Sequence, residues 1–105
     1  MERRLVVRLE AERDIEERVT QLAKRYPDAA HRFVIAVDSA LERIQRLPHV
    51  GAVRDFGHPA LRGVRAWRVP GHRHFLIFYK VTDTTIDVLR VPHSSRNVPR
   101  LLRRS

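Results

Sequence analysis

A histidine flanked by arginines is the feature of this sequence best suited to chemistry. His93 lies three residues after Arg90 and three residues before Arg96. An imidazole exchanges protons near neutral pH, and guanidinium groups bind phosphate oxygens. Cleavage of RNA through the 2′-hydroxyl needs a base, an acid for the leaving oxygen and cations around the phosphorus. Arg68 and Arg73 complete the set of basic candidates for that chemistry.

The same residues also have structural interpretations. Taken alone, His93 is better explained as a strand-end residue whose ring forms a hydrogen bond with the backbone. Along one strand, the period of two places Arg62 and Arg68 on one face and Arg65 on the other. Charged side chains of this kind are typical of an edge strand, where they prevent unwanted pairing.

Several other chemistries are excluded or disfavoured. The chain has no cysteine, which excludes a disulfide framework, a thiolate nucleophile, a zinc finger and an iron–sulfur site. His72 and His74 would place two imidazoles on one strand face, but no nearby carboxylate completes a metal site. A hairpin turn is the better explanation of that segment, and we expect neither a metal nor a cofactor.

Two aromatic residues could be mistaken for site residues. Tyr79 alternates in phase with Phe75 and Ile77, so we expect it in the core with its hydroxyl satisfied at the end of the sheet. Trp67 either packs beneath helices or forms an exposed interface anchor, and both interpretations stay open.

The charge of the chain is large and unevenly distributed. The formal net charge is +9 and the pI is near 11.4. Residues 1–53 carry ten basic and nine acidic side chains, whereas residues 54–105 carry eleven basic and three acidic ones. This predicts a polyanion or an acidic protein as partner. No signal peptide or membrane span is evident, so we expect a cytoplasmic protein with no membrane contact.

The first half of the chain has helical periodicity. Residues 5–9 are short and apolar, which favours a first strand. Residues 11–25 predict an amphipathic helix with acidic residues near its start. Prolines bound a second helix over residues 28–47, and the short connection predicts an antiparallel helical hairpin. The predicted core stripe of the second helix is Phe33, Val37, Leu41 and Ile44.

The second half has strand periodicity after a loop over residues 48–59. We expect an antiparallel meander of three strands, over residues 62–69, 74–81 and 85–91. The middle strand is apolar on both faces, so it should be central, with the helical hairpin on one side. A helical turn over residues 98–103 should dock Leu101 and Leu102 on the other side. These elements predict an α+β fold with one mostly antiparallel sheet, in a single domain over residues 1–105.

This order of elements resembles the RelE/ParE superfamily of toxins from bacterial type II toxin–antitoxin systems. The most specific pieces are residues 71–81, GHRHFLIFYKV, and residues 88–97, which hold Arg90, His93 and Arg96 at the spacing of the final-strand pattern. The resemblance covers nearly the whole chain. It implies a cognate antitoxin with a DNA-binding N-terminal part and an acidic C-terminal segment, and contact with operator DNA only through that antitoxin.

The C-terminus favours the ParE branch, whose members poison DNA gyrase. Toxins resembling RelE cleave messenger RNA on the ribosome and typically have a tyrosine soon after the position of Arg96. Here the chain continues as NVPRLL, which is similar to the ParE pattern except that Asn97 replaces an aspartate. We also expect the arginines of the second half to lie without carboxylate partners that would tune an acid–base pair.

The resemblance therefore implies a binding protein that needs no catalytic residue. The partner-binding residues expected on this basis are Arg62, Arg65, Trp67, Arg68, Arg90, His93, Arg96 and Arg100. The alternative is a RelE-like endoribonuclease with Arg68, Arg73, Arg90, His93 and Arg96 as its catalytic residues. A nucleic-acid-binding domain without a toxic role is a third interpretation, which the charge permits and the resemblance disfavours.

Overall fold

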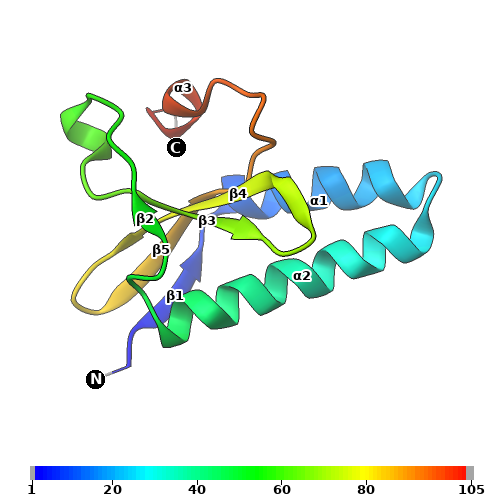
Figure 1. Ribbon diagram of the computed structural model, residues 1–105, viewed down its shortest axis with the longest axis horizontal. Helices are drawn as coiled ribbons and strands as arrows, with labels where there is room; N and C mark the ends of the chain where they lie inside the picture. The colour runs from blue at the N-terminus through cyan, green and yellow to red at the C-terminus, as the bar shows by residue number, and fades with distance from the viewer. Residues whose placement is uncertain (1, 104–105) are drawn as a thin grey trace.

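One sheet separates a helical hairpin from a smaller layer of short helices (Figure 1). The computed structural model describes residues 2–103. The elements are β1 (Arg4–Val7), α1 (Leu9–Ala23), α2 (Pro27–Arg46), β2 (Ala52–Val53), the 3₁₀ helix η1 (Pro59–Leu61), β3 (Arg65–Val69), β4 (His72–Val81), β5 (Thr85–Arg90) and α3 (Val98–Arg103). None of the helices in this part of the chain is long and apolar enough to cross a membrane.

The sheet confirms the predicted α+β class and the meander. Its order is β1-β5-β4-β3-β2, and only the β1–β5 pair is parallel. The predicted strand over residues 62–69 is too long, because η1 and Gly63, with φ of +83°, precede a strand that begins at Arg65. Arg62 therefore lies outside β3, and the prediction that it shares a strand face with Arg68 is wrong.

β3 is also not a simple edge strand, because β2 pairs with its first two residues. The sequence did not predict β2 or η1, which both lie within or next to the expected loop. Only the second part of β3 is left at the edge of the sheet. The expectation that its arginines occupy an edge strand is therefore right for Arg68 and wrong for Arg65.

The helical hairpin covers one face of the sheet, as predicted. Phe33, Val37 and Ile44 of α2 are buried in a core that includes Ile77 of β4. Leu41 is half-buried, and Ala40 takes the buried position beside it. Steps of three and four residues from Phe33 reach positions 37, 40 and 44, whereas Leu41 is turned away from the centre of the stripe.

The second face of the sheet is covered by α3 and η1. Leu102 of α3 is buried in a cluster with Leu61, Val64, Phe78 and Leu89. Leu101 is half-buried. The C-terminal turn therefore docks on this face as expected, with Leu102 as the buried residue.

Tyr79 fastens the loop after α2 to the sheet. Its side chain is fully buried, its hydroxyl donates to the Pro48 carbonyl at 2.9 Å, and it accepts from the Gly51 N–H at 2.9 Å. A Cβ at Gly51 would lie 2.6 Å from this hydroxyl oxygen, so the close approach requires glycine. Burial raises the pKa of Tyr79, which keeps the hydroxyl protonated as a donor. Tyr79 is the core residue that the alternation predicted.

The core assignment predicts unequal effects of two truncations on α2. Ile44→Ala should lower the free energy of unfolding by about 2–5 kcal/mol, because it leaves a cavity in a fully buried site. Leu41→Ala should cost less, because the side chain is already partly exposed. Denaturant unfolding of both variants measures the difference. A larger loss for Leu41→Ala would contradict the described orientation of α2.

Candidate functional site

An open cleft of about 600 Å³ lies where the β3–β4 turn meets α1 and the segment after β5. Its lining is basic and aromatic. The side chains that give it this character are Arg18, Arg68, His72, Arg73, His74, Phe75 and His93. None of the described residues that line it is acidic. This is the place in the described chain where several of the predicted site residues meet.

The β3–β4 turn carries two of these arginines. Val69 pairs with His72 across Pro70 and Gly71, and Gly71 has φ of +76°. Proline followed by a residue with positive φ is the pattern of a type II turn. The turn leaves Arg68 and Arg73 exposed near the tip of the hairpin.

An ion pair anchors the start of the segment after β5, whose His93 lines the cleft. Asp14 of α1 accepts from Nε and Nη2 of Arg90, both at 2.8 Å, and from the Val91 N–H at 2.9 Å. The two side chains are only 12–14% exposed. The hydrogen bond with Asp14 raises the pKa of Arg90 above its ordinary value. We call this set of contacts the Asp14 clamp.

The Asp14 clamp corrects a sequence expectation. The second-half arginines were expected to lack carboxylate partners, and for Arg90 this is wrong because its partner comes from the first half of the chain. Nε and Nη2 of Arg90 each donate to one oxygen of the Asp14 carboxylate. Arg90 therefore positions the segment that follows it.

His93 lies in the segment after β5, three residues beyond Arg90. It forms an isolated bridge with Phe75, and its Nδ1 accepts from the Ser95 N–H at 3.0 Å and lies 2.7 Å from Ser95 Oγ. The ring stacks on His74, with centroids 5.4 Å apart and planes at 21°. The predicted bond between this ring and the backbone is confirmed.

Arg18 is the lining residue that the sequence interpretation missed. Its guanidinium carbon lies 5.0 Å from the centroid of the Phe75 ring. Its Nε is buried and has no hydrogen-bond partner among residues 2–103. The available signal was its position four residues after Asp14, which puts both side chains on the same face of α1.

His72 and His74 point to different neighbours. The His72 ring meets Phe33 edge-on at 5.0 Å, whereas His74 stacks on His93. Both imidazoles line the cleft, but they pack against different rings, and a register shift in the β3–β4 ladder lies next to them. No group of three or more metal-binding side chains occurs among the described residues.

The remaining predicted partner-binding residues do not join the cleft. Arg65 donates to the Gly51 carbonyl at 2.7 Å, and Trp67 is half-buried against the helix-side core. Arg96 lines an adjoining depression that also contains Asp14 and Glu17. Arg62, after η1, and Arg100, in α3, are exposed. Of the eight predicted partner-binding residues, only Arg68 and His93 line the cleft itself.

Asn97 begins the C-terminal helix. Its Oδ1 accepts from the Arg100 N–H at 3.2 Å, and its carbonyl accepts from the Leu101 N–H at 3.1 Å. Asparagine and aspartate serve about equally well as helix N-caps. The substitution of asparagine at this point of the pattern is therefore compatible with the same local structure.

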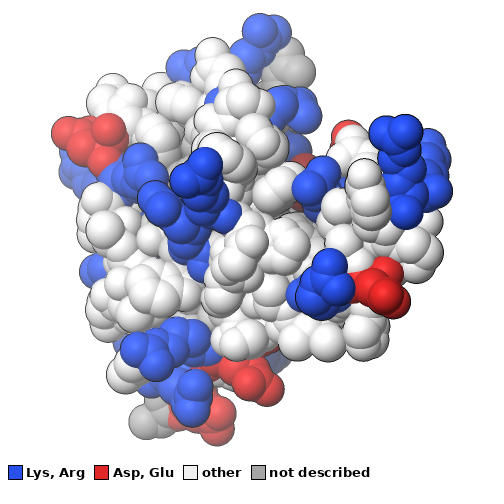
Figure 2. All heavy atoms as spheres, turned by 45° about the vertical axis from the view of Figure 1, so that its right-hand side comes forward, with Lys and Arg blue, Asp and Glu red and all other residues white. Residues whose placement is uncertain are grey.

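Charge on the surface is divided into separate groups. Figure 2 shows Lys and Arg gathered at several places on one face, with uncharged surface between them and fewer acidic groups. The positive charge of the chain therefore does not form one continuous field on that face. The cleft is a local concentration of basic side chains.

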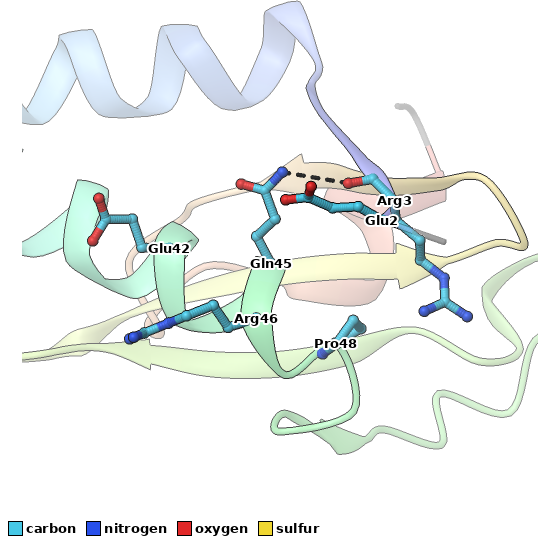
Figure 3. Close-up of a pocket in the computed structure, with 6 residues that line it drawn as sticks. All are labelled: Glu2, Arg3, Glu42, Gln45, Arg46 and Pro48. Carbon is cyan, nitrogen blue, oxygen red and sulfur yellow. Dashed lines mark hydrogen bonds between the residues drawn. The ribbon is translucent and has the colours of Figure 1, made fainter.

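A second depression, of about 430 Å³, lies between the start of β1 and the end of α2 (Figure 3). Its charged residues are of both signs: Glu2, Arg3, Glu42 and Arg46. Gln45 reaches from α2 and donates to the Arg3 carbonyl at 3.3 Å. This contact ties the residue before β1 to α2, so the depression lies at a structural contact between the start of the chain and the second helix.

Comparisons with known proteins agree with this architecture. The family model described as ParE toxin of the type II toxin-antitoxin system parDE matches residues 5–98. A solved structure described as the chromosomal ParDE TA system from P. aeruginosa is similar, with a TM-score of 0.71 and 21% identity. The match covers 87% of this chain and 95% of that chain. No curated protein gives a sequence match.

The surroundings of His72 predict a pH effect on stability. Burial, followed by the charges of Arg18 on α1 and Arg32 on α2, lowers the pKa of His72 from 6.5. Below pH 6.5, His72 therefore takes up a proton more readily in the unfolded chain than in the folded chain. The free energy of unfolding falls for this reason as pH falls through 6.5. Unfolding from pH 7.5 to 5.5 should show a smaller loss for His72→Gln than for the unmodified protein. Parallel curves would contradict the assignment.

Proposed function

Since this chain belongs to the ParE toxin family of type II toxin–antitoxin systems, we propose that it inhibits growth by poisoning DNA gyrase and is neutralised by a cognate antitoxin. In this proposal residues 1–105 act as one toxin domain in the cytoplasm. The protein acts by binding, with no residue of its own forming or breaking a covalent bond.

The observation that carries the proposal is the structure of the chain after Arg96. Asn97 caps α3, and Leu102 of that helix is buried against the second face of the sheet. The segment where RelE-like ribonucleases typically have a tyrosine is here used for packing. Tyr79 contributes its hydroxyl to Pro48 and Gly51, in the loop after α2.

The antitoxin that we propose is a small protein with a DNA-binding N-terminal part and an acidic C-terminal segment. The excess of basic side chains in residues 54–105 favours an acidic partner. Exposed apolar side chains, including Ile35 of α2 and Val53 of β2, supply surface that such a segment could cover. Operator DNA is contacted only through the antitoxin in this proposal.

A RelE-like endoribonuclease is the second candidate, and the cleft is the observation that favours it. Arg68, Arg73 and His93 line that cleft together. Arg90 is bound to Asp14, and Arg96 lies in the adjoining depression, so neither belongs to the same lining. His93 is the remaining proton-transfer candidate of the predicted set, and its Nδ1 is already bonded to Ser95.

A single substitution separates the two candidates. His93→Gln keeps polarity and much of the shape, so a gyrase-binding toxin should lose activity only through stability or contact. A ribonuclease that uses His93 as base or acid should lose roughly 10²–10⁴-fold in rate. The measurement is induction of each variant in cells, followed by assays of gyrase-dependent double-strand breaks and of messenger RNA cleavage.

The unmodified toxin should produce breaks and leave translated messenger RNA intact. Cleavage of messenger RNA with intact chromosomes would overturn the gyrase proposal in favour of the ribonuclease. Ser94→Ala, at an exposed position next to His93, serves as the matched control.

A further inference from the structure

We propose that the cleft between α1, the β3–β4 turn and the segment after β5 binds the phosphate backbone of single-stranded nucleic acid. The inference rests on the proposed function, in which the toxin acts on a gyrase–DNA complex. It adds a direct contact between the toxin and the nucleic acid of that complex. The binding itself follows from the lining of the cleft and is measurable without gyrase.

The first argument is uncompensated positive charge. Arg18, Arg68 and Arg73 line the cleft together, and none of its described lining residues is a carboxylate. Asp14, which lies in the adjoining depression, is bound to Arg90. Glu17 is exposed in that depression, outside the lining of the cleft. Guanidinium groups that have no carboxylate beside them favour phosphate oxygens as ligands.

The second argument is the buried donor on Arg18. Its guanidinium lies against the Phe75 ring, which restricts the side chain, and its Nε has no partner within residues 2–103. A buried donor without a partner costs free energy in the unliganded protein. An anion bound at the guanidinium would offset part of that cost once the Arg18 side chain turns its Nε toward the acceptor.

The third argument is a flat aromatic surface beside the charges. The exposed His74 ring is nearly parallel to the His93 ring, and His93 in turn meets Phe75 edge-on at 5.3 Å. Proteins that bind single strands combine such stacking surfaces with a positive groove. Bases in a duplex are already stacked on one another, so this surface favours a single strand. The volume of about 600 Å³ is within the range of small-ligand sites.

The test measures binding of purified toxin to a fluorescent 12-nucleotide DNA single strand over a range of salt concentrations. The matching RNA strand and the DNA duplex are separate probes. A poly-glutamate peptide tests whether the cleft instead prefers an acidic polypeptide. Three variants are compared: Arg68→Gln/Arg73→Gln in the cleft, Arg25→Gln/Arg43→Gln at exposed positions outside it, and His74→Ala.

The two double variants remove the same charge, so general electrostatics would affect them equally. We expect the cleft variant to bind the single strand at least about tenfold more weakly than the control variant, because bonds to charged groups are lost. Its salt slope should fall by about 1.4 in magnitude if two phosphate contacts are removed. His74→Ala should weaken binding about fivefold or more and leave the salt slope unchanged, since it removes stacking alone.

Equal losses in the two double variants would overturn the inference, as would duplex binding as tight as single-strand binding or a preference for poly-glutamate. Similar affinities for DNA and RNA strands would support the shared phosphate chemistry, and a preference for either strand would identify the source. Thermal unfolding of each variant checks that it is folded. Gyrase-dependent breaks in cells test the proposed function separately, so breaks without oligonucleotide binding would contradict only this inference.

Discussion

The Asp14 clamp is the contact on which the shape of the cleft depends. It joins α1 to the end of β5 across 76 positions of the sequence, through two bonds to Arg90 and one to the Val91 backbone. Breaking a buried ion pair by removing one partner typically costs about 3–5 kcal/mol, because the other charge stays buried. With both side chains mostly buried, Asp14 sets where the chain leaves the sheet.

The segment after β5 depends on this exit point and on β4. The Ser94 N–H donates to the His74 carbonyl at 2.6 Å, and the Leu76 N–H donates to the Pro92 carbonyl at 3.3 Å. These bonds align His93 with Phe75 and His74, which places an imidazole at the boundary between the cleft and the adjoining depression. The same segment then reaches Asn97, where α3 begins. One carboxylate thus influences both the cleft wall and the cover of the second sheet face.

The sequence predicted what depends on local periodicity. The helical hairpin, the three-strand meander and the burial of Tyr79 all follow from spacings of three to four or of two. Contacts between distant segments were not predictable in this way. The pairing of Asp14 with Arg90 requires knowing which face of α1 meets β5. The ring contacts of His72 with Phe33 and of His74 with His93 require knowing how distant segments pack. β2 is two residues long and has no periodicity to detect.

The same difference between local periodicity and long-range contact explains why only some of the predicted site residues line the cleft. The resemblance grouped eight residues of the basic half of the chain as partner-binding, but Arg65 and Arg90 among them are bound within the fold. Arg90 is held by Asp14 and Arg65 by the Gly51 carbonyl, so their charges serve the fold. Arg18 was missed because it belongs to the half of the chain with nearly balanced charge. Net charge along the sequence therefore does not indicate which basic side chains are paired within the fold and which line the cleft.

Amide hydrogen exchange in Asp14→Ala tests most directly whether the Asp14 clamp fixes the cleft wall. Glu17→Ala, an exposed carboxylate on the same helix, is the control. The account predicts that the amides of Val91, Ser94 and Arg96 lose protection in Asp14→Ala, while the Ile77 amide in the middle of β4 stays protected. Unchanged protection at Val91, or an equal loss at Val91 and Ile77, would contradict it.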